Sequence, residues 1–171
     1  MAKPNAGEYP PYFKSFIDTT KEEEVVPALK SSGINLVNIL FGMSEELSSY
    51  RYEPKKWSIK QLLGHIVDTE MVFQFRAMSF ARGEKAALPG FDHDLYVKNS
   101  NAEELPLAHL LKQFEATRNA TILLFEGFTE EMLNTKGNAN GFEISLRALG
   151  FIIAGHQQHH LNIIKERYLK E

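Results

Sequence analysis

Cysteine is absent from this chain of 171 residues. Without a thiol there is no disulfide scaffold, no thiolate metal site, no iron–sulfur cluster and no cysteine nucleophile. A borderline metal ion such as zinc would therefore have to be held by histidine.

Positive charge in excess is also missing. Nineteen Lys and Arg face 22 Asp and Glu, so the net charge is −3. Binding to nucleic acid usually needs surplus cations that neutralise phosphates, and we expect no such partner. The longest strongly apolar run, 148–155, is much shorter than the roughly 20 residues that cross a bilayer. The first residues also lack the apolar stretch of a secretory signal, so we expect a cytoplasmic protein with no membrane partner.

The sequence that remains is typical of a soluble globular protein. Hydrophobic residues make up 43% and charged residues 24%, which is enough of each to form a core and a solvated surface. The length suits one domain spanning residues 1–171.

Apolar residues recur with the helical period, and no stretch alternates as a strand would. The periodic segments predict four long helices, at 20–43, 58–81, 106–126 and 145–169. Thr20 with Glu23, and Ser58 with Gln61, have the spacing of capping boxes at two of the starts. Pro27 leaves open a later start for the first helix, since proline suits a first helical turn.

The segments between these helices read as connections. The long stretch 83–102 is of a length that is usually functional or crosses a bundle, and 136–141 reads as a loop by composition. Four long helices with polar faces favour an all-α, antiparallel four-helix bundle, with a short N-terminal extension and short connecting helices. Residues 41–47 and 127–132 are faintly similar, which suggests two helix-hairpin halves related by a pseudo-two-fold axis.

Histidines carry most of the functional information. Residues four apart on a helix share a face, with Cβ atoms roughly 5–6 Å apart, which suits two imidazoles on one divalent ion. On a helical wheel, His156 and His160 fall either side of the middle of the apolar stripe. His159 falls on its flank, and Arg167 falls on the inward line.

A third histidine lies on the predicted helix 58–81. His65 shares a face with Thr69 and Arg76 there, and alone it would be an ordinary core histidine. Three inward imidazoles without a cation would each need a hydrogen-bond partner in a mostly apolar interior. A three-histidine metal site with open coordination positions is therefore favoured over three separately satisfied core residues.

Several other residues are candidates near such a site. Asp68 has the spacing to accept the spare N–H of a ligand histidine, or it is a solvated or capping carboxylate, and the sequence does not separate these. Thr69 is a further candidate for contact with a ligand or with the pocket. Arg76 could hold an anionic substrate, although an ion pair with a bundle carboxylate is favoured.

The remaining polar candidates are weaker. His93, between Asp92 and Asp94, could cover the site or lend a general base, but a polar surface loop is favoured. His109 is expected to be exposed. Trp57 is expected to staple the start of its helix rather than to stack on a ligand.

Three segments together resemble one family. They are KWSIKQLLGHIVDTE at 56–70, FARG with LPGFD at 80–83 and 88–92, and AGHQQHHLNIIKERY at 154–168. Over about residues 27–169 the chain resembles the DinB-like superfamily of YfiT-like metalloproteins.

The resemblance implies a four-helix bundle that holds one divalent ion, zinc or nickel, through His65, His156 and His160. It implies a metal-dependent hydrolase, or a transferase that uses a low-molecular-weight thiol such as bacillithiol or mycothiol as cosubstrate. Dimers are common in the family, so a homodimer is expected. The resemblance supplies no substrate and no catalytic acid or base. We therefore expect a small-molecule enzyme, and the alternative is a non-catalytic metal- or ligand-binding stress-response bundle.

Overall fold

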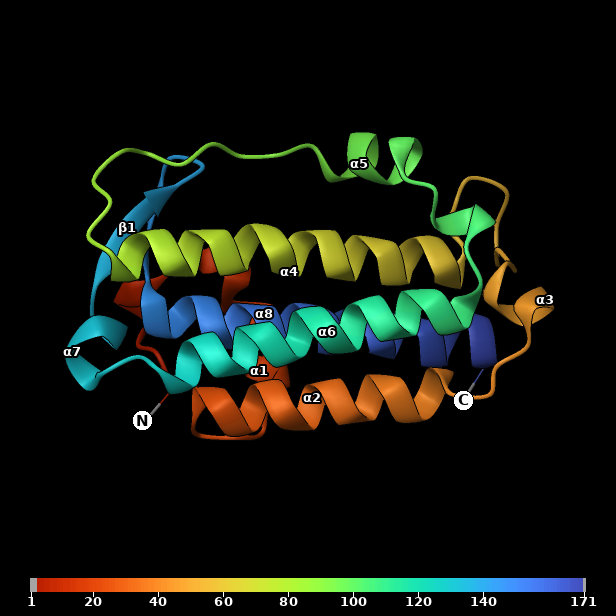
Figure 1. Ribbon diagram of the computed structural model, residues 1–171, viewed down its shortest axis with the longest axis horizontal. Helices are drawn as coiled ribbons and strands as arrows, with labels where there is room; N and C mark the ends of the chain where they lie inside the picture. Colours follow the sequence, from red (N-terminus) through yellow and green to blue (C-terminus); the bar gives the residue numbers. More distant parts are fainter. Residues whose placement is uncertain (1–2, 171) are drawn as a thin grey trace.

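The computed structural model describes residues 3–170. Its main elements are four long helices, α2 (Val25–Leu40), α4 (Ile59–Ala81), α6 (Leu107–Glu126) and α8 (Leu146–Ile163). Figure 1 shows them lying side by side along the length of the molecule. The expected all-α four-helix bundle is confirmed, but it is not antiparallel throughout, because α4 and α6 run in the same direction (Figure 1).

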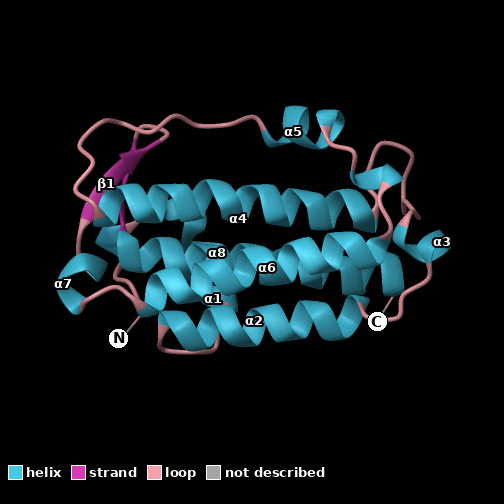
Figure 2. Ribbon diagram, viewed as in Figure 1, coloured by secondary structure: helices cyan, strands magenta, loops and turns pink. Residues whose placement is uncertain are grey.

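Shorter elements surround the bundle. The helices among them are α1 (Lys14–Thr19), α3 (Glu45–Ser48), α5 (His93–Asn99) and α7 (Glu130–Leu133), with 3₁₀ turns at Ala6–Glu8, Pro11–Phe13 and Ala102–Glu104. The two strands are β1 (Lys136–Ala139) and β2 (Phe142–Ser145). Figure 2 shows the hairpin and α7 at one end of the bundle, α3 at the other end, and α5 beside α4.

The capping box expected at the start of α4 is confirmed. The Ser58 hydroxyl accepts from the Gln61 backbone N–H, and the Gln61 side chain accepts from the Ser58 backbone N–H, each at 3.2 Å. The two pairings satisfy donors that a helix start otherwise leaves free.

The box expected at the start of the first long helix is wrong. α2 begins at Val25 with Glu24 as its N-cap, and Thr20 instead closes the separate helix α1. The Thr20 hydroxyl donates to the Ile17 carbonyl, so it serves the end of one helix and not the start of the next. Pro27 lies inside the first turn of α2, where its missing N–H costs little.

The loop expected at 136–141 is also wrong. β1 and β2 pair antiparallel, with Lys136 opposite Ser145 and Ala139 opposite Phe142. Asn140 and Gly141 both have positive φ, 55° and 80°, as a two-residue hairpin turn requires. The strands are too short to show alternation, and the Asn-Gly pair is the signal that marks them.

The connection expected at 83–102 crosses the bundle and contains α5. Figure 1 shows it running back along α4 from the hairpin end of the molecule. The hairpin holds its first part, because the Leu88 N–H donates to the Asn138 carbonyl and the Asn140 N–H donates to the Leu88 carbonyl. Farther along the connection, the side chain of Val97 on α5 is buried. The connection is therefore fixed at two points along α4.

The two similar short segments form matching helices. α3 is capped by the Ser44 hydroxyl, which accepts from the Leu47 N–H, and α7 is capped by the Thr129 hydroxyl, which accepts from the Met132 N–H. Each is four residues long and precedes a long helix of the bundle after a further connection.

The last helix changes its winding. After Ile163, α8 continues as a π-helical turn over Ile164–Leu169, which has more residues per turn than an α-helix. The helical wheel therefore loses its phase here. Arg167, expected to point inward, is exposed, and Tyr168 is buried in its place.

A buried polar layer divides the apolar core. One apolar cluster lies toward the hairpin and includes Phe73 and Phe80, and the other lies toward α3 and includes Leu63. Along each long helix, polar residues separate the members of the two clusters. Arg118 of α6 and Glu70 of α4 are the charged residues of this layer, with exposed fractions of 4% and 2%.

Arg118 joins all four long helices. Its Nε and Nη2 donate to the two Glu70 carboxylate oxygens at 2.8 and 2.9 Å. Its Nη1 donates to the Leu29 carbonyl and the Ser32 hydroxyl of α2, and to the Gln157 side-chain oxygen of α8 at 3.2 Å. The guanidinium therefore donates hydrogen bonds to three neighbouring helices at once.

Within the described residues, no helix is long and apolar enough to cross a membrane.

Replacing Arg118 with Met should lower the free energy of unfolding by about 3–5 kcal/mol, because the Glu70 carboxylate is left buried and unpaired. The double variant Arg118→Met, Glu70→Leu should recover part of that loss, since both charges are then gone. Urea denaturation of the two variants measures the difference. A single variant as stable as the parent would contradict a bridging role.

Gly155 permits a close approach of α1 to α8. A Cβ at this position would lie 1.9 Å from the Phe16 carbonyl oxygen, a backbone atom that cannot turn aside. Gly155→Ala should therefore lower the free energy of unfolding by roughly 1–3 kcal/mol. Gly7→Ala is the matched control, because nothing lies within 4 Å of a Cβ there. Equal melting temperatures for the two variants would contradict the contact.

Candidate metal centre

Three imidazoles from two helices meet beside the polar layer. His65 comes from α4, and His156 and His160 come from α8. The Nε2 atom of His156 lies 3.1 Å from that of His65 and 3.0 Å from that of His160. One ring nitrogen from each residue falls within 4.8 Å of the other two, so the group could hold a metal ion.

The environment keeps these rings neutral. Burial lowers the pKa of His65 to about 4 and that of His160 to about 3. Burial, followed by the neighbouring His160 and His65, lowers the pKa of His156 well below its usual value. Neutral imidazole is the form that binds metal ions, so the rings are ready to act as ligands at neutral pH.

The three nitrogens cannot satisfy one another. A neutral imidazole nitrogen carries either one proton or one lone pair, yet the His156 Nε2 faces two others. Among the described residues, the buried His160 Nδ1 also has no hydrogen-bond partner. A tetrahedral zinc ion with bonds of about 2.0–2.1 Å separates its ligand nitrogens by roughly 3.3 Å, close to the observed spacing. The donor set therefore fits a divalent ion.

Thr69 touches the cluster from outside. Its hydroxyl lies 3.4 Å from the His65 Nδ1, at the far side of the ring from the other histidines. Such a contact helps to hold the orientation of the ring. Asp68 is half-buried, and burial raises its pKa. Asp68 makes no hydrogen bond to a histidine in the described part of the chain.

Two residues that the sequence placed elsewhere lie against the cluster. The Trp57 ring is 5.0 Å from the His65 ring, and the His93 ring on α5 is 5.7 Å from it. The position of His93 between two aspartates on a long connection is a signal for such a role. The His93 side chain is nevertheless 57% exposed, as the favoured interpretation of a polar surface residue predicted.

The other candidates lie away from the cluster or pair differently. His109 is exposed, as expected, and His159 is exposed with its ring 5.3 Å from that of Phe16. Arg76 is buried, but it forms no ion pair with a carboxylate among residues 3–170. It donates instead to the Pro89 carbonyl at 2.9 Å.

An open cavity borders the cluster at His160. It has a volume of about 270 Å³, and His160 lines it together with Tyr52, Lys55, Lys56, Trp57, Leu62, Asp94, Ile163 and Tyr168. The imidazole cluster is thus not sealed under apolar side chains. Small molecules of modest size have access to the His160 side of the site, and the wall offers cations, a carboxylate and aromatic rings.

Fold and site together define a four-helix bundle with a histidine cluster that could bind metal. The model of the DinB superfamily matches residues 29–164. The chain therefore belongs to the DinB superfamily, as its sequence motifs indicated.

Two relatives illustrate the match. A protein of Oceanobacillus iheyensis, provisionally named a metal-dependent hydrolase, is 29% identical over 125 residues, which are 72% of this chain and 71% of that protein. The structure of YfiT from Bacillus subtilis, described as a probable metal-dependent hydrolase with an unusual four-helix bundle topology, superposes with a TM-score of 0.77. That match covers 85% of both chains at 16% identity, and it shows a shared fold.

Lowered histidine pKa values make the metal-free protein sensitive to acid. Between pH 6.5 and about 4, the unfolded chain binds a proton at His65 that the folded chain does not. Stability is therefore lost as the pH falls through this window, by roughly 3 kcal/mol for His65 alone. Urea midpoints of chelator-treated protein from pH 7 to pH 4 measure the slope. The slope should weaken in His65→Leu and persist in a variant of the exposed His109. Equal slopes in the parent and His65→Leu would contradict this.

Proposed function

We propose that this protein is a mononuclear metal-dependent enzyme that acts on a small molecule, and that His65, His156 and His160 hold its metal ion. The carrying observation is the meeting of three neutral imidazole nitrogens beside a cavity that His160 lines. The name of the Oceanobacillus relative supports hydrolysis as the reaction class.

The chemistry that a bound zinc or nickel ion supplies is a lowered pKa for a coordinated water or thiol, which yields a nucleophile near neutral pH. The chain's own residues provide the rest. Thr69 orients the His65 ring, and the Trp57 ring excludes water from one side of it. His93 lies over the same ring from α5.

Transfer involving a low-molecular-weight thiol is the second candidate reaction. The observation that favours it is the pair Lys55 and Lys56 on the cavity wall. Low-molecular-weight thiols commonly carry carboxylates, and cations along a cleft raise the local concentration of anions. A thiol cosubstrate would enter past these lysines toward His160.

A non-catalytic binding role is the alternative of a different class. It would leave the metal without access to substrate. The open cavity at His160 favours a catalytic role over a binding role, because catalysis needs a coordination position that a small molecule can reach.

Elemental analysis tests the ligand assignment. Untagged parent protein, purified without added metal or chelator, should contain one equivalent of zinc or nickel. His160→Ala should lose the metal together with any esterase or thiol-transfer activity, because two imidazoles bind far more weakly than three. His159→Ala is the matched control, since it removes the exposed neighbouring ring. Full metal content in His160→Ala would refute the assignment.

Metal uptake and turnover together test the enzyme proposal. A parent protein that takes up neither zinc nor nickel when each is supplied would refute it, and the three histidines would then be core residues. A metal-loaded parent that turns over neither esters nor thiol acceptors would favour the binding role.

A further inference from the structure

A second cavity lies farther along α4, under the connection that crosses the bundle. Its volume is about 320 Å³, and its walls are apolar side chains of α4 and of residues 88–96. Arg76 is the only charged residue among those that line it. Arg76 is eleven residues beyond His65, about 16 Å along the helix, so this cavity is separate from the imidazole cluster.

Arg76 is buried without a counter-ion. Its exposed fraction is 5%, and it has no carboxylate within ion-pair distance in the described residues. Its guanidinium donates one hydrogen bond, from Nη2 to the Pro89 carbonyl, and stacks 5.3 Å from the Phe73 ring centre. The Arg76 Nε is buried and has no partner in this part of the chain. Burial also lowers the pKa of Arg76.

An unpaired buried cation is costly, so its presence calls for an explanation. Transfer of a charge from water into an apolar site is unfavourable unless a partner compensates it. A guanidinium offers five N–H donors in a planar fork that matches a carboxylate, and this one uses a single donor within the protein. The unused donors are suited to an anion from solution.

A merely structural role does not account for Arg76. Its one hydrogen bond holds residue 89 of the connection, but the hairpin already holds the adjacent Leu88 through two backbone hydrogen bonds. A neutral donor could make the same contact with Pro89 without the cost of a buried charge. The partners of the guanidinium inside the chain are the Pro89 carbonyl and the Phe73 ring, and neither carries the negative charge that would neutralise it.

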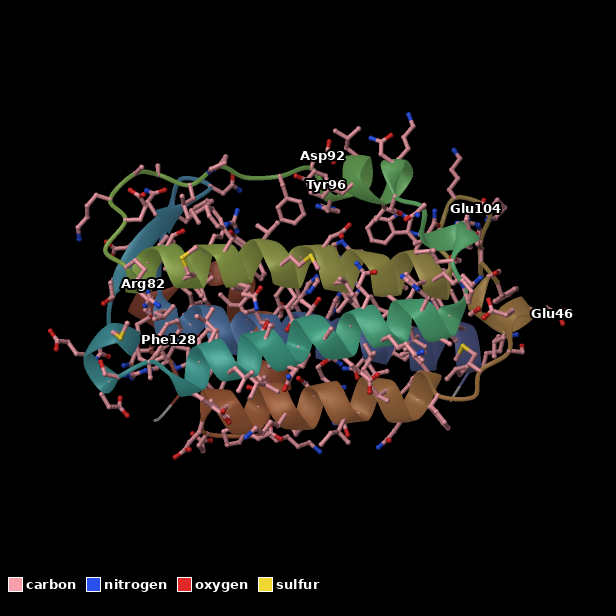
Figure 3. The ribbon with its side chains drawn as sticks, in the orientation of Figure 1. Glu46, Arg82, Asp92, Tyr96, Glu104 and Phe128 are labelled. Atoms are coloured by element: carbon pink, nitrogen blue, oxygen red, sulfur yellow. The ribbon has the colours of Figure 1, made fainter. Side chains whose placement is uncertain are left out.

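The mouth of the cavity is unusually apolar. Phe75, Met71 and Tyr96 line it and are exposed by 53%, 44% and 44%. Figure 3 shows Tyr96 on α5, above α4. Large apolar side chains gathered around one opening are typical of a surface that binds an apolar group.

We propose that this cavity binds an organic anion, with its carboxylate on the Arg76 fork and its apolar body against Phe75, Met71 and Tyr96. The volume is at the lower end of the range of about 300–1,000 Å³ for small-molecule sites. A ligand with a short chain and one ring therefore suits it. None of the residues that line this cavity is one of the three histidines, so the proposal can be tested separately from the proposed enzyme.

Calorimetric titration of the purified, metal-loaded protein with two probes tests the charge. 4-Phenylbutyrate carries a carboxylate on an apolar body, and 4-phenylbutan-1-ol carries the same body without charge. Phenylbutyrate should bind at least tenfold more tightly, because hydrogen bonds to charged groups are the stronger ones. Equal affinities, or no binding of phenylbutyrate at millimolar concentration, would overturn the proposal.

Arginine variants locate the binding. Arg76→Gln should lose at least tenfold in affinity for phenylbutyrate and leave the alcohol unchanged. Arg82→Gln is the matched control, because this arginine caps the same helix but is exposed and does not line the cavity. Figure 3 shows Arg82 at the end of α4. Loss of affinity in both variants alike would overturn the assignment to Arg76.

A third variant keeps the test valid if Arg76→Gln fails to fold. Val72 lines the same cavity one helical turn before Arg76, so Val72→Glu places a carboxylate at the spacing that pairs best with an arginine. Val72→Glu should melt at a higher temperature than Val72→Gln and should no longer bind phenylbutyrate. Equal melting temperatures of the two variants, together with binding of phenylbutyrate by both, would overturn the proposal.

Discussion

One buried guanidinium fixes the register of the four long helices, that is, their positions along one another. Apolar stripes alone allow neighbouring helices to slide by a turn, since one leucine can replace another in the contact. Arg118 removes that freedom, because its bonds to Glu70 and Gln157 form only in one register. A slipped register would leave two charges buried and unpaired, at a cost of several kcal/mol. Charge pairing therefore selects the arrangement that hydrophobic packing stabilises.

The same register assembles the histidine cluster. Glu70 lies five residues after His65 on α4, and Gln157 is the residue after His156 on α8. On both α4 and α8, one face contributes a side chain to the buried polar layer around Arg118. Another face of the same helix carries the histidines of the cluster. Because burial keeps the imidazoles neutral, the cluster adds no further charge to an interior that already holds an ion pair. The buried polar groups are thus divided into one ion pair and one cluster of three neutral imidazoles.

The sequence predicts those features that depend on local pattern. The helical period gives the bundle, Ser58 with Gln61 marks the start of α4, and the wheel selects His156 and His160 as inward. Contacts between residues distant in sequence are visible in it only where a motif marks them, as the three histidines do. Arg118 and Glu70 look like ordinary polar residues of two separate helices until the fold places them 2.8 Å apart. The position of Arg167 fails for a local reason, because a π-helical turn has a period that the wheel does not use.

A single segment forms a wall of both cavities, and this ties them together. The connection after α4 is held at Leu88 by the hairpin, and its later part carries Tyr96 to the Arg76 cavity and Asp94 to the cavity at His160. An occupant of one cavity therefore contacts a short helix that also borders the other. Linkage requires that any influence on affinity be equal in both directions. Asp94 and Tyr96 lie two residues apart on α5, so each cavity is bordered by the same short helix.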